Sequence, residues 1–321
     1  MTPVLRQTQT FRTILCPIDF SPHSALALRH AVAMARRSKG HVTALYVNNP
    51  LLIAAAAAAA YDERALVRTS GAELKRFVVQ SLGKKDARGV EQIVTIGEAA
   101  REIGKAARRL SADLIVVGTQ GLSGAGKLFF GSTTQRVLRE AKVPILAVPP
   151  GGPGGRPSAS WPGMRVLAAI DLGSEALADA RAAAAVAHGV GAELVLAHVV
   201  PPDQAPRWLT LRLGERRQRR LAQARATLVR LAADVRNGLR VEAHVRPGDP
   251  ADQISSLAAD TRAGLVIVAL RRGEGLWGAA QGSITYHVLS GGCTVPILAL
   301  PGHARRSRRP APIQPDPSAF T

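Results

Sequence analysis

The sequence predicts an α/β protein of two tandem, doubly wound domains, each built on a mostly parallel five-stranded sheet. Apolar runs with little alternation are typical of strands buried on both faces, and here they alternate with helical patterns, as in βα units. Shifted by 151 or 152 residues, the chain also aligns with itself, so that residues 14–19 match 166–171 and residues 143–148 match 295–300. Because the elements keep their order, we interpret the chain as a duplicated domain.

In the first half, the apolar runs predict strands at about 13–18, 42–47, 91–96, 113–118 and 144–148. The helical patterns between them predict helices at about 22–38, 61–82, 98–110 and 132–141. In a sheet wound this way, ligands bind at the carboxyl ends of the strands, where the strand order reverses. Asp19, Val47 and Gly118 each lie near the carboxyl end of a predicted strand, so we expect them to converge.

Composition divides the chain into segments. We expect domains at residues 12–149 and 164–301, joined by a linker at residues 150–163, where proline and glycine break regular structure. Residues 302–321 form a basic tail that we expect to be disordered, like residues 1 to about 11, because both segments are polar or rich in proline. The alanine-rich residues 54–60 either extend the helix that begins near Tyr61 or form a small apolar lid.

The chain is strongly basic, with 42 lysines and arginines against 23 acidic residues and a formal net charge of +19. Much of the excess lies in Arg207–Arg225, Lys84–Arg109 and Arg305–Arg309, which is typical of solvated helix faces and tails. Only 4% of the residues are aromatic, and no nucleic-acid-reading motif is recognisable. Specific nucleic-acid recognition is therefore not expected, whereas nonspecific association with polyanions stays open.

No apolar run is long enough to span a bilayer, and the first residues do not resemble a secretion signal. The two cysteines, Cys16 and Cys293, lie beside apolar strand patterns and are expected to be reduced, buried and structural. We therefore expect a cytoplasmic protein that does not contact membranes.

The most informative segment runs from Gly118 to Ser132. Gly118 ends an apolar run, Gly121 follows, and after nine further residues Gly131 and Ser132 precede a helical pattern. Glycine lets the backbone pass close to a bulky anion, and a helix start offers free N–H groups and the positive end of the helix dipole. The segment therefore predicts a phosphate site, with a nucleotide as its ligand.

These features resemble the universal stress protein family in its tandem two-domain form. The nucleotide-binding members carry Gly-x2-Gly-x9-Gly-(Ser/Thr) after the fourth strand, and Gly118, Gly121, Gly131 and Ser132 match it. The family also has an aspartate at the end of strand one and an apolar residue at the end of strand two. The resemblance implies an adenine nucleotide alpha hydrolase-like fold and ATP, alone or with Mg²⁺, or another adenine nucleotide as the ligand.

Carried over by position, the resemblance also implies the contacts to that nucleotide. Adenine and ribose would be bordered by Pro17, Ile18, Asp19 and Val47. Ribose and phosphates would be contacted by Gly118, Thr119, Gly121, Gly131, Ser132 and Thr133. For Asp19 a turn or a helix cap is the structural alternative, and for Gly131 and Ser132 it is an ordinary helix cap.

The second half departs from this pattern. It keeps an aspartate, an apolar residue and a Gly-Ser pair at the matching positions, which are Asp171, Val199, Gly282 and Ser283. However, Ala269 and Arg272 replace the first two glycines. The added Cβ and guanidinium would crowd the pocket, which favours a degenerate, empty site. The alternative is an altered anion site in which Arg272 pairs with a phosphate.

The sequence offers little catalytic machinery, because it shows no paired carboxylates, Ser-His-Asp set or His/Cys metal spacing. Residues 121–128 imitate a P-loop, but Leu128 replaces the hydroxyl residue that would ligate Mg²⁺. We therefore favour an ATP-binding stress-response regulator with little or no catalysis. The alternatives are a nucleotide-independent basic scaffold that binds a protein or nucleic-acid partner, and a slow ATPase.

The last strand of each half, at residues 143–148 and 295–300, is apolar and needs to be covered. Since domains of the family pair through their last strands, the resemblance implies that the two halves pair with each other as a pseudo-twofold unit. A homodimer and an unidentified protein partner remain open.

Overall fold

The computed structural model describes residues 9–51, 53–54, 63–119, 131–140, 142–150, 157–158, 160–202, 213–270 and 293–301. The strands of the first half are β1 (Thr13–Ile18), β2 (His41–Asn48), β3 (Val90–Ile96), β4 (Leu114–Gly118) and β5 (Ile145–Val148). Its helices are α1 (Pro22–Ser38), α3 (Glu63–Leu82), α4 (Lys84–Ala87), α5 (Ala99–Arg109) and α6 (Ser132–Glu140). The predicted elements of this half agree with these bounds to within two residues, whereas the four-residue α4 is too short to show a helical period.

The second half repeats the same order. Its strands are β6 (Arg165–Ala169), β7 (Glu193–Val200), β8 (Val241–Pro247), β9 (Leu265–Leu270) and β10 (Ile297–Pro301). Its helices are α7 (Ala176–Val190), α8 (Leu213–Val235) and α9 (Pro250–Asp260). The duplication predicted from the sequence is therefore confirmed in the architecture.

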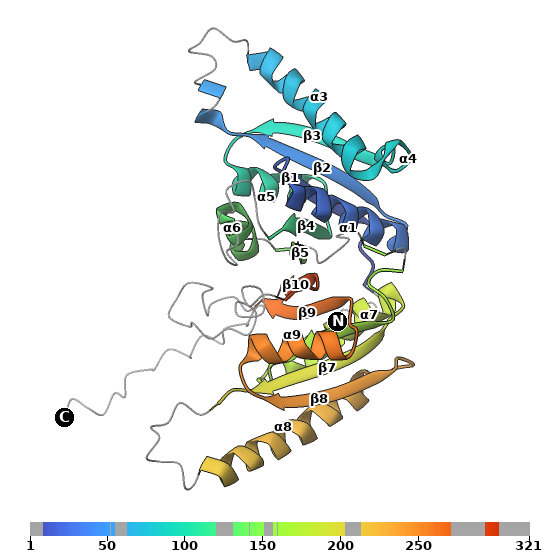
Figure 1. Ribbon diagram of the computed structural model, residues 1–321, viewed down its shortest axis with the longest axis vertical. Coiled ribbons are helices and arrows are strands. Elements are labelled where there is room, and N and C mark those ends of the chain that lie inside the picture. Colours follow the sequence, from blue (N-terminus) through green and yellow to red (C-terminus); the bar gives the residue numbers. More distant parts are fainter. Residues whose placement is uncertain are drawn as a thin grey trace, which may run out of the picture.

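The strands form one 10-stranded sheet in the order β3-β2-β1-β4-β5-β10-β9-β6-β7-β8, which Figure 1 shows from top to bottom. Neighbouring strands within each half are parallel, and the two halves meet at the antiparallel pair β5 and β10, where Leu298 lies opposite Leu146. Read from one end the order is β3-β2-β1-β4-β5, and read from the other end the equivalent strands of the second half follow in the same order, β8-β7-β6-β9-β10. A pseudo-twofold relation between the halves produces this symmetry. The predicted fold class and the pairing through the last strands are confirmed.

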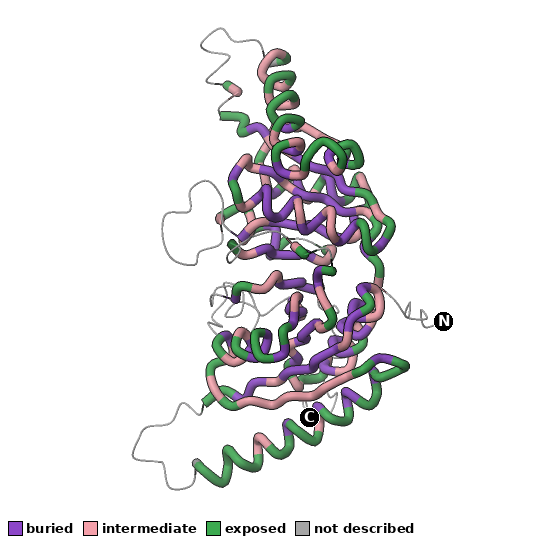
Figure 2. The backbone as a smooth tube through the Cα atoms, turned by 45° about the vertical axis from the view of Figure 1, so that its right-hand side comes forward, coloured by how far each residue is buried: buried purple, intermediate pink, exposed green. Residues whose placement is uncertain are grey.

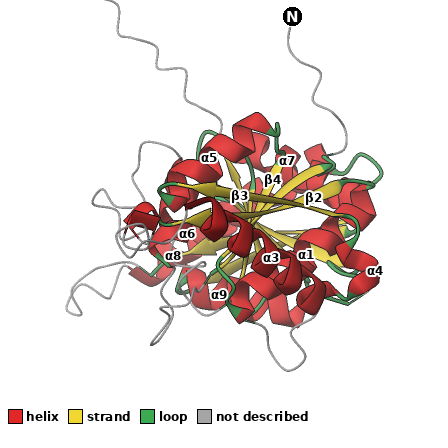
Figure 3. Cartoon of the chain, turned by 90° about the horizontal axis from the view of Figure 1, so that it is seen from above, coloured by secondary structure: helices red, strands yellow, loops and turns green. Residues whose placement is uncertain are grey.

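Helices cover both faces of the sheet (Figure 3). One face packs on α1, α3, α7 and α8, and the other on α5, α6 and α9. Along β4, Leu114 and Val116 join the first core while Ile115 and Val117 join the second. Such burial on both faces explains why the strands appear in the sequence as unbroken apolar runs.

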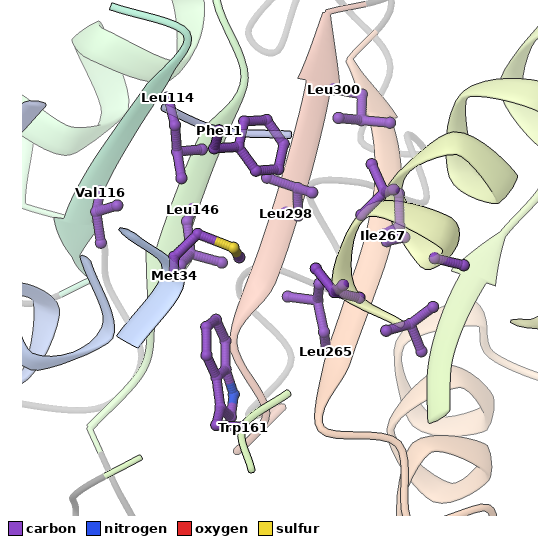
Figure 4. Close-up of a cluster of buried hydrophobic side chains, with 14 of the residues drawn as sticks. Phe11, Met34, Leu114, Val116, Leu146, Trp161, Leu265, Ile267, Leu298 and Leu300 are labelled. Carbon is purple, nitrogen blue, oxygen red and sulfur yellow. The ribbon is translucent and has the colours of Figure 1, made fainter. Parts of the chain in front are cut away.

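Two aromatic residues outside the regular elements fill the seam between the halves. Phe11 is 1% exposed and Trp161 is 7% exposed, and Figure 4 shows Phe11 beside Leu298 and Trp161 below Met34 in the same buried cluster. Trp161 donates from Nε1 to the carbonyl oxygen of Gly264 at 2.9 Å. The seam is therefore held by side chains from the N-terminal segment and from the expected linker.

The expectation of disorder up to about residue 11 is wrong for its last residues. Gln9 donates its backbone N–H to the carbonyl oxygen of Ala185 in α7 at 2.9 Å, so the N-terminal segment of the first half reaches the second. The physical reason is the apolar side chain of Phe11, which gains a buried position that the polar composition of its neighbours does not reveal.

Arg37 of α1 links the first half to the end of the expected linker and to α7 of the second half. Its guanidinium donates to the carbonyl oxygens of Trp161 and Ser160, each at 2.8 Å, and to that of Val190 at the end of α7. Because a guanidinium presents several donors in a fixed plane, one side chain fixes the linker end and α7 against α1.

The two cysteines are free and buried, as predicted. Burial is the main cause that raises the pKa of both thiols, and the charge of Asp19 adds to it at Cys16. Among the described residues, no helix combines the length and apolarity needed to cross a membrane. The alanine run at 55–60 lies outside the described residues.

Substituting Gly264 by alanine is expected to destabilise the seam. A Cβ at this position would lie 2.0 Å from the carbonyl oxygen of Pro162, which is backbone and cannot rotate away. We expect a loss of about 2–3 kcal/mol in the free energy of unfolding, measured by urea titration. Gly71→Ala is the matched control, because its Cβ meets nothing within 4 Å and alanine favours the helix. Equal stability of Gly264→Ala and the wild type would contradict this packing.

The stability is expected to depend on pH through His30. The ring is 6% exposed, binds the carbonyl oxygen of Leu26 through Nδ1 and lies 4.9 Å from the Trp161 ring. Burial lowers the pKa of His30 below its usual value, and the charge of Arg29 lowers it further, against the opposing hydrogen bond to Leu26.

Between the lowered pKa of the folded state and about 6.5, the unfolded chain binds a proton at His30 that the folded chain does not. The free energy of unfolding should therefore fall as the pH decreases below about 6.5, by at most about 1.4 kcal/mol per pH unit. His30→Gln should flatten this dependence in urea titrations between about pH 5 and 7.5, whereas substitution of the exposed His41 by glutamine should preserve it. An unchanged slope in His30→Gln would show that other groups cause the dependence.

Candidate functional site

The carboxyl ends of three neighbouring strands form the edge at which the candidate site lies. β1 stands between β2 and β4, and the registers place Ile18 opposite Tyr46 and Ile14 opposite Leu114. The chain leaves β1 toward β2, whereas β4 lies on the other side of β1, so the strand order reverses between β1 and β4. Open α/β sheets bind ligands at this kind of edge.

Asp19 follows β1 and shapes the turn into α1. Its Oδ1 accepts the backbone N–H of Ser21 at 3.0 Å, while Ser21 caps the helix by accepting the N–H of Ser24 at 3.1 Å. The turn alternative is therefore present in the structure. This turn engages one carboxylate oxygen of a half-buried residue, so the same carboxylate can also accept a bond from a ligand hydroxyl.

The residue after Asp19 has a left-handed backbone. Phe20 has a φ of +63°, which is uncommon for a residue other than glycine, asparagine or aspartate. Its ring packs 4.4 Å from the ring of Tyr46 and 5.5 Å from that of Phe77. Burial and then the charge of Asp19 raise the pKa of Tyr46. This aromatic group fixes the direction in which the chain leaves β1.

Gly118 ends β4 against the first turn of α1. A Cβ at this position would lie 3.0 Å from both the carbonyl carbon and the carbonyl oxygen of His23. The contact is backbone to backbone, so the neighbouring atoms cannot move without shifting the helix. The structure thus supplies a reason for glycine at 118 that the sequence pattern did not reveal.

The start of α6 lies beside the end of β4. Thr134 donates from Oγ1 to the carbonyl oxygen of Gly118 at 3.1 Å, and Gly131 donates its N–H to the carbonyl oxygen of Thr119 at 3.3 Å. Ser132 and Thr133 are exposed in the first helical turn. Since N–H groups in the first turn have no partner within the helix, this edge presents donors suited to an anion.

The structure therefore brings most of the sequence-predicted residues to one edge. Those it describes there are Pro17, Ile18, Asp19, Val47, Gly118, Thr119, Gly131, Ser132 and Thr133. Gly121 lies outside the described residues. Val47 is half-buried and packs on the core beneath α5 and α6. Their contact with a nucleotide stays a prediction.

Sequence reasoning did not identify Thr134 or Asn48 as part of this edge. Asn48 ends β2, is 7% exposed and accepts a bond from Ser70 at 2.9 Å. Its Nδ2 has no partner among the described residues. The signal that could have found it is a polar residue at the end of an apolar strand, where it meets α3.

The second half differs at the corresponding edge. Pro22 corresponds to Ser174, but α7 begins only at Ala176, and the N-cap residue Glu175 makes no side-chain capping hydrogen bond. The second half thus combines a later helix start with alanine at position 269, where the first half has Gly118. His198 is satisfied at this edge by a 2.8 Å bond between Nδ1 and the carbonyl oxygen of Ile170.

Of the predicted second-site residues, the structure describes two. Asp171 is exposed and Val199 is 3% exposed, more deeply buried than Val47. Arg272, Gly282 and Ser283 lie outside the described residues. Within the described ranges, histidine, cysteine, aspartate and glutamate side chains nowhere form a group of three that could hold a metal ion.

Gly118→Ala is expected to destabilise the contact between β4 and α1, by about 1–2 kcal/mol in urea-induced unfolding, because the Cβ meets fixed backbone of His23. Gly104→Ala is the matched control, since its Cβ has only the flexible end of Arg108 nearby, at 3.6 Å. Alanine at 104 should stabilise α5. If Gly118→Ala were as stable as the wild type, the packing explanation would fail.

The universal stress protein family model matches residues 10–149 and 164–301. A universal stress protein from Thermus aquaticus is 33% identical over 140 residues, which are 43% of this chain and 98% of that protein. One from Methanocaldococcus jannaschii is 30% identical over 141 residues, 43% of this chain and 82% of that protein. The crystal structure of a universal stress protein from Archaeoglobus fulgidus shares the fold over 90% of this chain and 98% of its own, with a TM-score of 0.64 and 21% identity.

Proposed function

The chain belongs to the universal stress protein family, and from this premise we propose that its first half binds an adenine nucleotide, ATP alone or with Mg²⁺, as a stress-response regulator. The observation that carries the proposal is the junction of β4 with α6. There the bonds from Thr134 to Gly118 and from Gly131 to Thr119 hold a helix start at the edge where the strand order reverses.

The residues at this edge divide naturally between the parts of a nucleotide. Val47 is half-buried and offers apolar surface for adenine, with Ile18, which is 5% exposed, beside it in the core, and the Asp19 carboxylate offers an acceptor for a ribose hydroxyl. The backbone N–H groups and hydroxyls of Ser132 and Thr133 offer donors for phosphates. Thr119 is 9% exposed and donates its backbone N–H to the carbonyl oxygen of Val148, which fixes the end of β4 beside β5.

We propose that one nucleotide binds per chain, in the first half. The two halves differ in the start of the first helix and in the aligned residue near the carboxyl end of the fourth strand, which is Gly118 in one and Ala269 in the other. With Arg272 in place of the second glycine, the second half lacks the motif that the first half keeps.

The proposed role is regulatory because the described groups near the site are poorly suited to fast hydrolysis. The Asp19 carboxylate is assigned to a ribose hydroxyl and not to the phosphates, and burial raises the pKa of Cys16 and Tyr46, so both stay protonated near neutral pH. A general base or nucleophile must be available in its reactive form. Bound nucleotide would then regulate by changing the surface that the protein presents to a partner, and not by being hydrolysed.

Gly131→Asp should abolish nucleotide binding and leave the fold intact. The new carboxylate would stand at the helix start where phosphates are proposed to bind, and it would repel them. Aspartate is also a favourable residue at a helix N-terminus, so the thermal unfolding temperature should not fall. Isothermal titration of the full chain with Mg-ATP measures the loss.

Gly282→Asp is the matched control in the second half and should bind ATP like the wild type. Denaturing the purified chain and quantifying the released nucleotide gives the stoichiometry independently. Two nucleotides per chain would overturn the assignment to the first half alone, and ATP turnover that Gly131→Asp removes would favour a slow ATPase. No binding in the wild type would refute the proposal.

A further inference from the structure

The N-terminal end of α8 is a strongly basic helix surface that the sheet does not cover. Of residues 214–222, all but the half-exposed Arg220 and Leu221 are exposed, and the first buried residue is Ala224. Figure 2 shows the exposed end of the helix extending outward below β8. We call Gly214–Ala222 the basic end of α8.

This segment carries four arginines against one acidic residue, Glu215. Glu215 and Arg219 approach to 3.8 Å, with side chains that are 82% and 84% exposed, so the pair is worth little in free energy. Arg216 and Arg217 are exposed beside it. The helix dipole adds positive potential at the same end.

The internal duplication shows that packing does not require these arginines. Leu228 of α8 and Leu74 of α3 are both 0% exposed, and each is followed four residues later by another buried residue, Ala232 and Val78. Aligned on these positions, residues 214–222 match residues 60–68, which contain two arginines and two acidic residues. The excess charge is therefore a property of α8 and not of the fold.

The side chains of the basic end of α8 indicate which class of partner it binds. Within Gly214–Ala222 the one large apolar residue is Leu221, which is half-buried, so this described segment offers cations without an apolar face of its own for insertion into lipid. Guanidinium groups match phosphate oxygens in geometry and charge. Three exposed arginines within four residues of a helix can contact successive phosphates of a nucleic-acid strand.

We propose that the basic end of α8 binds the phosphate backbone of nucleic acid without reading base sequence. The surface lies beside the outermost strand of the second half, β8, far along the sheet from the edge formed by β1, β2 and β4 (Figure 1). Binding there is independent of the proposed nucleotide site.

The test compares the full chain with the triple variant Arg216→Gln, Arg217→Gln, Arg219→Gln. A labelled duplex of about 30 base pairs is titrated at several salt concentrations between about 50 and 300 mM, with a second duplex of unrelated sequence. We expect the variant to bind both duplexes about tenfold more weakly or worse at low salt. The slope of log K against log salt should fall by about 2 to 3, close to one for each phosphate that the variant no longer neutralises.

The control variant is Lys84→Gln, Lys85→Gln, Arg88→Gln, which removes the same charge from exposed positions in and after α4. It should keep most of the salt slope. Equal losses of affinity in both variants would overturn the proposal, because binding would then follow net charge alone. Unchanged binding in the α8 variant would also overturn it.

Two further measurements keep the outcome decisive. Circular dichroism melting shows whether the α8 variant is folded, which glutamine should allow because it is a good helix former. Vesicles of phosphatidylserine and phosphatidylcholine serve as the alternative polyanion. If the wild type bound these vesicles but not the duplexes, the surface would be a membrane contact and the proposal would be wrong.

Discussion

The antiparallel pairing of β5 with β10 is the constraint on which the rest of the structure depends. It places Leu146 opposite Leu298 and turns two five-stranded sheets into one, so that neither half exposes its last strand as an open edge. The join is reinforced away from the sheet. Phe11 and Trp161 fill the seam, and Arg37 binds carbonyl oxygens from the linker end and from α7. The two halves are therefore one packed unit.

Because the β5–β10 pair joins the halves, the regions of each half away from that pair can differ from each other. The β1–α1 turn is built by Asp19, Ser21 and Ser24, and α1 begins so close to β4 that glycine is needed at 118. In the second half the helix begins later and alanine stands at 269. The two halves therefore differ both in the residue at this position and in the start of the first helix. A duplicated domain can in this way keep its shared core while its two copies differ at the corresponding edge.

The same logic applies to the helices that flank the outermost strands. α3 and α8 share a pattern of buried residues where they cover the sheet, because that part is fixed by packing. Beyond the sheet their sequences diverge in charge. Where burial imposes no requirement, the residues can be selected for a partner, and such divergence between repeats marks surfaces worth testing.

The sequence by itself determined the fold class, the duplication, most strand and helix bounds and the convergence of Asp19, Val47 and Gly118 at one edge. These follow from local periodicity and from the winding of parallel sheets. Only the tertiary structure decided that Phe11 and Trp161 belong to the core and that Gly118 packs on His23. A single aromatic residue in a polar or Pro/Gly-rich segment carries no period, and the space around a glycine depends on a helix distant in sequence. Burial is a property of neighbours in space, which local patterns cannot specify.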